Sequence, residues 1–270
     1  MTTIIARSAE SVHWYRKDGA PQYTVKAKDG SDRATTLRDA RKMDLVPSVT
    51  TILKIAAKPA LEAWKLEQML LAALTLPRKP DEPEREFIGR IVADSKETAK
   101  QAAEDGTRIH ESIERWFNGE RDVEHKVSAL ATDKAIHDHF LTHPHQPWLL
   151  ERAFASTLGF GGKVDMYCLP DELAPTGLVL DVKSKDFFNA DDVKGYDEHL
   201  MQLAAYRYGL GLPNARCANV FVSRRIPSLV KIIEWSQEDL AKGWDMFMCL
   251  MQYWKLKNKF GVTDENSTNK

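Results

Sequence analysis

The chain has 270 residues, and 43% of them are hydrophobic, which suits one large globular domain, or one domain with a helical appendage. The formal net charge is only −1, so the chain lacks the strong overall positive charge of many nucleic-acid binders. Basic clusters remain at residues 38–42, 224–225 and 255–259, where they could contact phosphates or simply form solvated faces.

The three cysteines, Cys168, Cys217 and Cys249, are isolated and lack the close spacing of a zinc or iron–sulfur site. We therefore expect reduced thiols, an intracellular setting and no iron–sulfur cluster. No segment reaches the roughly 18 consecutive apolar residues that span a bilayer, which predicts a soluble, cytoplasmic protein with no membrane partner.

The N-terminal half is predicted to be mainly helical after a polar, turn-rich start with strand fragments near residues 14–15 and 23–25. Ser48 is placed to cap a helix that runs to about residue 55. Apolar residues at helical spacing predict a second helix over 60–76, which Pro77 ends, and a charged helix follows over about 84–104.

We expect Asp105 and Gly106 to interrupt this charged helix before the next helical segment, which carries His110 and Glu114 on one face. Beyond it the pattern predicts a helix over 126–141 and strands over 148–156, 161–168 and 178–183. A helix around Gln202, strands over 218–222 and 229–235, and a last helix from residue 236 to about 260 complete the order. This order predicts an α/β core in which helices flank a mixed central sheet.

Two aspartates and a lysine lie on two of the predicted strands. Alternation along a strand places Asp181 and Lys183 on one face, while Val182 turns to the other. Asp165 lies on the preceding strand, and a pair of carboxylates can hold a magnesium ion that keeps water and a phosphate as its other ligands. An Asp-x-Lys tripeptide alone means little, because about one is expected by chance in a chain of this length.

Four signals follow one another in a recognisable order: Gly-x-x-x-His ending at His110, Asp165, Asp-x-Lys at 181–183, and Gln-x-x-x-Tyr from Gln202 to Tyr206. In this order the chain resembles the RecB-like branch of the PD-(D/E)XK nucleases. Residues 47–53, Glu151 and the Trp-rich last helix narrow the similarity to the mitochondrial genome maintenance exonuclease family and its phage relatives, over about residues 47–259.

The resemblance implies a restriction-endonuclease-like core with a helical N-terminal region. We divide the chain into an irregular cap (1–45), a helical region over the active site (46–105), the nuclease core (106–260) and a polar tail (261–270). The implied metal ligands, for Mg²⁺ or Mn²⁺, are His110, Asp165, Asp181 and the main-chain carbonyl of Val182. Nitrogen ligation by the histidine would suit manganese better than magnesium.

Further roles follow from the same resemblance. Lys183 would orient water or stabilise charge on the phosphate, and Glu151 would orient a water molecule. Gln202 and Tyr206, one helical turn apart, would bind phosphate or hold Lys183 in place. Three hydroxyl residues, Ser184, Ser48 and Thr50, are further candidates for contact with the DNA backbone, although a simple helix start explains the last two equally well.

The implied function is a metal-dependent exonuclease that prefers single-stranded DNA ends, in phage-type replication, recombination or repair, with proteins of those processes as possible partners. A phage or prophage protein in a bacterial host is the setting that the resemblance favours. A structure-selective endonuclease and a non-cleaving DNA-binding scaffold remain alternatives. Tryptophans such as Trp116, Trp244 and Trp254 are interpreted as core residues and not as platforms for bases.

Overall fold

A computed structural model describes residues 12–142 and 146–261, so nearly all of the predicted polar tail lies outside the described residues. The helices are α1 (Leu37–Lys42), α2 (Val49–Leu53), α3 (Pro59–Thr75), α4 (Glu84–Phe117), α5 (Lys126–Phe140), α6 (Asp197–Gly209) and α7 (Gln237–Lys257), with a short 3-10 turn, η1 (Ala190–Asp192). The strands are β1 (Trp14–Tyr15), β2 (Thr24–Lys26), β3 (Asp32–Ala34), β4 (Val46–Pro47), β5 (Leu149–Ser156), β6 (Phe160–Cys168), β7 (Leu178–Lys185), β8 (Arg216–Ser223) and β9 (Val230–Trp235).

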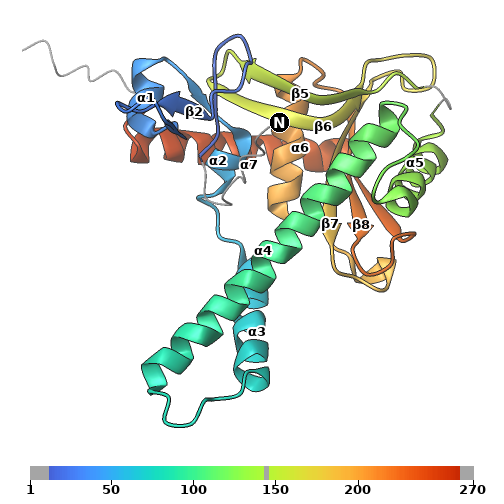
Figure 1. The fold of residues 1–270 in the computed structure, drawn as a ribbon. Coiled ribbons are helices and arrows are strands. Elements are labelled where there is room, and N and C mark those ends of the chain that lie inside the picture. Colours follow the sequence, from blue (N-terminus) through green and yellow to red (C-terminus); the bar gives the residue numbers. More distant parts are fainter. Residues whose placement is uncertain (1–11, 143–145, 262–270) are drawn as a thin grey trace, which may run out of the picture.

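A mixed five-stranded sheet in the order β5-β6-β7-β8-β9 forms the centre of the molecule. Its strands β7 and β8 are parallel, while the other neighbouring strands are antiparallel. Helices α4 and α5 cover one face, and α6 with α7 covers the other (Figure 1). The mixed α/β architecture expected from the sequence is therefore present.

Each face of the sheet has its own apolar core. Under α4 and α5, alternate residues of β7 such as Leu180 and Val182 pack against Ile109 and Ile113. On the other face, the core beneath α6 and α7 also takes in Trp14, which is only 1% exposed. The N-terminal segment from β1 to α2 therefore contributes residues to the core beneath α6 and α7.

The predicted break at Asp105 and Gly106 is wrong, because α4 is one continuous helix of 34 residues through both positions. Gly106 serves a different purpose. A Cβ at this position would lie 2.5 Å from Oγ of Ser184 on β7, so glycine permits α4 to approach the strand closely. The predicted division between residues 105 and 106 falls inside this helix.

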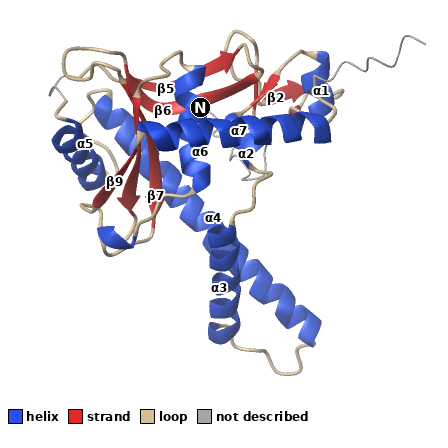
Figure 2. Ribbon diagram, turned by 180° about the vertical axis from the view of Figure 1, so that it is seen from behind, coloured by secondary structure: helices blue, strands red, loops and turns tan. Residues whose placement is uncertain are grey.

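An arm projects from the body of the molecule. Helix α3 and the first half of α4 form a helical hairpin that stands clear of the sheet in both views (Figures 1 and 2). At its turn Arg90 donates to Glu82 at 2.7 and 2.8 Å, which lowers the pKa of Glu82 to about 2. The apolar residues that predicted α3 are largely exposed, as at Leu70 (57%) and Leu74 (84%).

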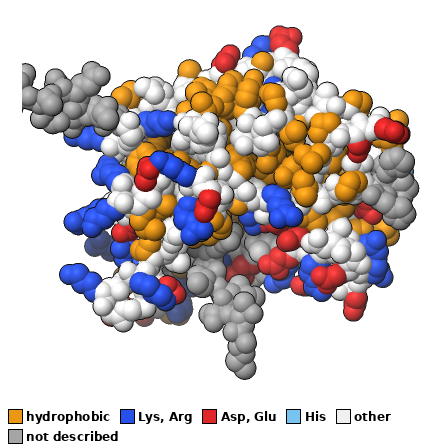
Figure 3. Space-filling view, turned by 90° about the horizontal axis from the view of Figure 1, so that it is seen from above, with side chains coloured by type: hydrophobic (Ala, Val, Ile, Leu, Met, Phe, Trp, Pro, Cys, Tyr) orange, Lys and Arg blue, Asp and Glu red, His pale blue; other side chains and the backbone are white. Residues whose placement is uncertain are grey.

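Two of the three predicted basic clusters come together at one end of the molecule. The Arg41 guanidinium donates to the main-chain carbonyl of Asn258, which joins α1 to the chain just beyond α7. Figure 3 shows Lys and Arg side chains gathered at the end where Figure 1 draws α1, and hydrophobic side chains over the middle of that face. No helix in the described ranges is long and apolar enough to cross a membrane.

A double-mutant cycle tests the close approach of α4 to β7. Alanine favours a helix over glycine by about 1 kcal/mol, but its Cβ would meet the Ser184 hydroxyl. We expect Gly106→Ala to increase the free energy of unfolding only in a Ser184→Ala background. Urea denaturation of the wild type, both single variants and the double variant measures this, and equal effects in the two backgrounds would contradict it.

Candidate active site

The site lies where the central sheet forks. Strands β6 and β7 pair only from Met166 opposite Leu180 to Cys168 opposite Leu178, and then they separate. Asp165 and Asp181 are the first residues beyond this pairing, one on each strand. Asp165 accepts a hydrogen bond of 2.8 Å from the main-chain N–H of Val182, which links the two strands across the fork.

Asp181 is a buried carboxylate with three side-chain donors. It is only 1% exposed, and its oxygens accept from Lys183 Nζ at 2.7 Å and Gln202 Nε2 at 2.9 Å. The third donor is Asn219 Nδ2, at 2.8 Å. Because a buried charge needs partners to offset its lost hydration, these donors make the position of Asp181 possible.

Lys183 carries a positive charge at the fork. Burial on its own would lower the pKa of Lys183, but the charges of Asp181 and Asp165 and the hydrogen bond to Asp181 outweigh it. The pKa of Lys183 is therefore raised above its usual value, and the ammonium form persists at neutral pH. For Asp165, burial first and then the charge of Asp181 raise the pKa.

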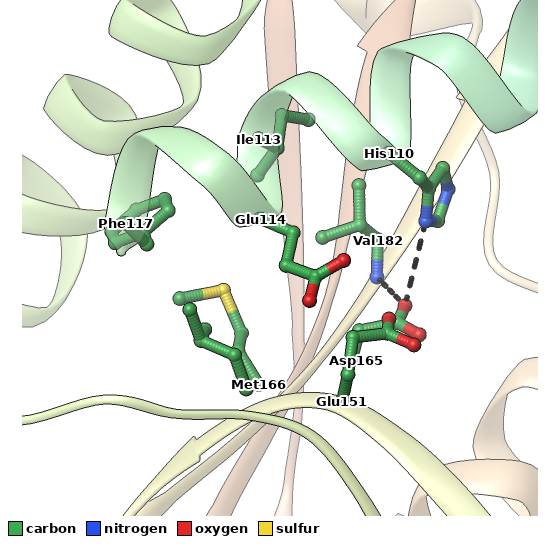
Figure 4. A pocket seen from close by; sticks show the side chains of 9 residues that line it. His110, Ile113, Glu114, Phe117, Glu151, Asp165, Met166 and Val182 are labelled. Atoms are coloured by element: carbon green, nitrogen blue, oxygen red, sulfur yellow. Dashed lines mark hydrogen bonds and ion pairs between the residues drawn. The ribbon is translucent and has the colours of Figure 1, made fainter. Parts of the chain in front are cut away.

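Helix α4 brings a histidine and a glutamate to the other side of the fork. His110 Nδ1 lies 4.0 Å from a carboxylate oxygen of Asp165, and Glu114 follows one helical turn later. Both side chains line a small pocket with Glu151 and Asp165 (Figure 4). Three acidic side chains and one imidazole thus converge on this pocket.

Glu151 sits at an irregular point of β5. Its φ of +51° lies in the left-handed region that non-glycine residues seldom adopt. Strand pairing stops at Leu150 and resumes at Arg152, which leaves Glu151 and Asp165 facing each other across the gap in the pairs. The Glu151 carboxylate forms an ion pair with Lys163. The predicted role of Glu151 in orienting water stays a prediction.

Gln202 and Tyr206 support Asp181 from within the protein. Gln202 Nε2 donates both to Asp181 and to the Tyr206 hydroxyl, each at 2.9 Å. Burial first, and then the charges of Asp181 and Asp165, hold the pKa of Tyr206 well above its usual value. Both side chains are buried, so they are placed to position Asp181; the predicted contact with phosphate stays a prediction.

The remaining predicted substrate contacts lie in other surroundings. Ser48 is 2% exposed and caps α2 by accepting from Thr51 N, so the simple helix start accounts for it. Thr50 is partly buried beside it, with 3.0 Å between the hydroxyls of Ser48 and Thr50. Ser184 lies beneath α4 against Gly106. Phosphate binding by these three residues stays a prediction.

Asn219 was missed by sequence reasoning. It lies directly opposite Asp181 in the parallel pairing of β7 and β8, and it is fully buried. Trp235 Nε1 donates to its carbonyl oxygen at 2.8 Å. Since the indole N–H can only donate, this bond turns the Asn219 amide nitrogen toward Asp181. A lone polar residue inside the apolar run of β8 was the available signal.

The donor chemistry of the fork fits a hard divalent cation. Across the described residues, no group of three or more His, Cys, Asp or Glu side chains is arranged to hold a metal ion. Magnesium does not require such a group, because it binds through one or two carboxylates and keeps several waters. Asp165 and Asp181 are two carboxylates at the fork, and the His110 imidazole lies beside Asp165; their role as metal ligands stays a prediction.

No protein-family model matches the chain, and no curated protein matches it. An alkaline exonuclease (LHK-Exo) from Laribacter hongkongensis is similar with a TM-score of 0.37 and 12% sequence identity, covering 74% of this chain and 95% of that chain. A protein designated SSO0001 is similar with a TM-score of 0.26 and 12% identity, covering 70% of this chain and 86% of that chain. Likenesses of this size establish neither a shared fold nor a shared activity.

Removal of the Asn219 amide tests its support of Asp181. We expect Asn219→Ala to lower the free energy of unfolding by about 1–3 kcal/mol, because it removes one of three donors from the buried Asp181 carboxylate and leaves the Trp235 indole N–H without its acceptor. The matched control is Asn214→Ala, which truncates an exposed asparagine. Urea denaturation monitored by tryptophan fluorescence measures both, and equal small effects would contradict the role.

Proposed function

We propose that this protein is a metal-dependent deoxyribonuclease that hydrolyses phosphodiester bonds from the ends of DNA, preferably single-stranded DNA. The observation that carries the proposal is the fork, where Asp165, Asp181 and Lys183 meet beside His110. Two carboxylates, an ammonium group and an imidazole at one opening in a sheet suit phosphoryl chemistry better than a purely structural role. The resemblance in motif order supports the same conclusion.

The residues at the fork would share two tasks in the proposed reaction, which are metal binding and stabilisation of charge. Asp165, Asp181, His110 and the carbonyl of Val182 would hold Mg²⁺ or Mn²⁺. The bound ion would neutralise phosphate charge and favour a nucleophilic water. Lys183, which the neighbouring carboxylates keep charged, would stabilise the negative charge that develops on the phosphate.

Four further side chains near the fork would either position Asp181 or order water. Gln202 and Asn219 hold the Asp181 carboxylate from two sides, so its direction does not depend on the metal alone. Glu114 and Glu151 line the pocket next to Asp165, where they would order water.

The arm supports a preference for strand ends. His110 belongs to the same continuous helix that forms the far side of the arm, so the hairpin is tied directly to the site. Arg224 strengthens this link by donating to the main-chain carbonyl of Ala102 in α4, at 2.8 Å. A projecting wall anchored beside the fork would admit a thin strand with an end more easily than a duplex. We place the activity in phage-type DNA replication, recombination or repair.

Cleavage assays on matched substrates test the function. We expect linear single-stranded DNA to be degraded in magnesium or manganese and to survive in chelator, while a covalently closed single-stranded circle is spared. An Asp181→Asn variant is the inactive control. Cut circles would favour a structure-selective endonuclease, and binding without any cleavage would favour a DNA-binding scaffold.

Lys183→Ala tests the charge at the fork. We expect cleavage to fall by at least about a hundredfold, because the variant removes a group that stabilises developing charge. The fold should persist, since Gln202 and Asn219 still donate to Asp181. Turnover is measured on end-labelled single strands, with circular dichroism to confirm folding. Near-normal turnover in a folded variant would remove Lys183 from the mechanism.

A further inference from the structure

Strand β7 continues beyond the fork with a second lysine on the same face. Asp181, Lys183 and Lys185 alternate along the strand, so successive side chains on this face lie about 6.6 Å apart. This is close to the spacing of neighbouring phosphates in an extended single strand. Lys185 is partly exposed, and none of the proposed catalytic steps uses it.

An accessible aromatic ring stands beside Lys185. Tyr196 precedes α6 as its N-cap residue and is 36% exposed. The Lys185 ammonium lies 5.6 Å from the centroid of the Tyr196 ring. A partly open ring next to a cation pairs a surface for a base with a charge for a phosphate.

His199 adds a hydrogen-bond donor to the same place. Its ring centroid is 5.5 Å from that of Tyr196, and its Nδ1 accepts from the main-chain N–H of Tyr196 at 3.3 Å. Burial first, and then the charge of Lys183, lowers the pKa of His199 to about 4, so the ring is neutral at pH 7. With Nδ1 accepting, the hydrogen is on Nε2, which can donate.

Several charged groups act on His199. The charges of Lys183, Lys58 and Lys185 disfavour its protonation, while the charge of Asp181 favours it. The acidic Glu198 in the same helical turn is engaged with Lys58 at 3.6 Å. A phosphate here would be attracted by Lys185, whose ammonium lies against the Tyr196 ring.

We propose that Lys185, Tyr196 and His199 form a subsite for the nucleotide next to the scissile phosphate. Its base stacks on the Tyr196 ring, and its phosphate contacts Lys185 Nζ and His199 Nε2. This inference rests on the proposed nuclease function and names the substrate class, because a base is free to stack on a side chain only when it is unpaired. The subsite therefore selects single strands at the site itself, independently of the arm.

Binding of a short single-stranded oligonucleotide in chelator tests the subsite without any turnover. The fluorescent base 2-aminopurine is moved one position at a time along the oligonucleotide. We expect quenching at one position in the wild type, loss of that quenching in Tyr196→Ala with about tenfold weaker binding, and retention of both in Tyr196→Phe. Lys185→Ala should reduce the dependence of the binding constant on salt by about one phosphate contact.

A matched control comes from α7, which contributes no residue to the fork. Tyr253 is 55% exposed, and the Lys257 ammonium lies 5.8 Å from its ring centroid, the same arrangement as Lys185 with Tyr196. We expect Tyr253→Ala to bind and quench like the wild type. Weaker binding of equal size in Tyr196→Ala and Tyr253→Ala would overturn the subsite.

The two proposals fail in different ways. If the wild type degrades linear single strands while Tyr196→Ala binds and quenches like the wild type, the subsite is wrong and the nuclease function stands. If the wild type neither binds nor cleaves DNA in any metal, the function is wrong and the subsite falls with it. Quenching that persists in Tyr196→Ala would assign the stacking to another ring.

Discussion

The buried charge of Asp181 is the constraint on which the rest of the site depends. A carboxylate that is 1% exposed inside a sheet is tolerated only with donors on several sides. These donors come from three elements: Lys183 on β7, Gln202 on α6 and Asn219 on β8. Because Trp235 fixes the orientation of Asn219, β9 also takes part. Packing of the sheet and α6 therefore sets the direction of one carboxylate.

Separation of β6 from β7 turns this buried group into a site. While strands pair, their main-chain groups are occupied; beyond the last pair, Val182 N–H is free to bind Asp165. Helix α4 crosses close to β7 at this point, which the missing side chain of Gly106 allows, and so delivers His110 and Glu114. The same helix extends into the arm, so the site and the arm share one continuous helix.

Gly106 shows how a correct pattern can carry a wrong structural meaning. Glycine lowers helix stability by about 1 kcal/mol, which made a break plausible, but the helix formers around it offset that cost. Gly106 and His110 lie one helical turn apart, where Gly106 faces Ser184 and His110 lies beside Asp165. Similarly, the apolar spacing of α3 predicted the helix correctly, although most of its apolar side chains are exposed.

Local periodicity alone determined that Asp181 and Lys183 share a strand face and that Gln202 and Tyr206 share a helix face. These relations span two to four residues, and backbone geometry fixes them. Only the tertiary structure decided that Asp165 and Asp181 lie at the same fork and that Asn219 lies opposite Asp181. It also decided that Glu114 and Glu151 line one pocket. Those contacts depend on strand register and helix packing between distant segments, which periodicity within one segment does not specify.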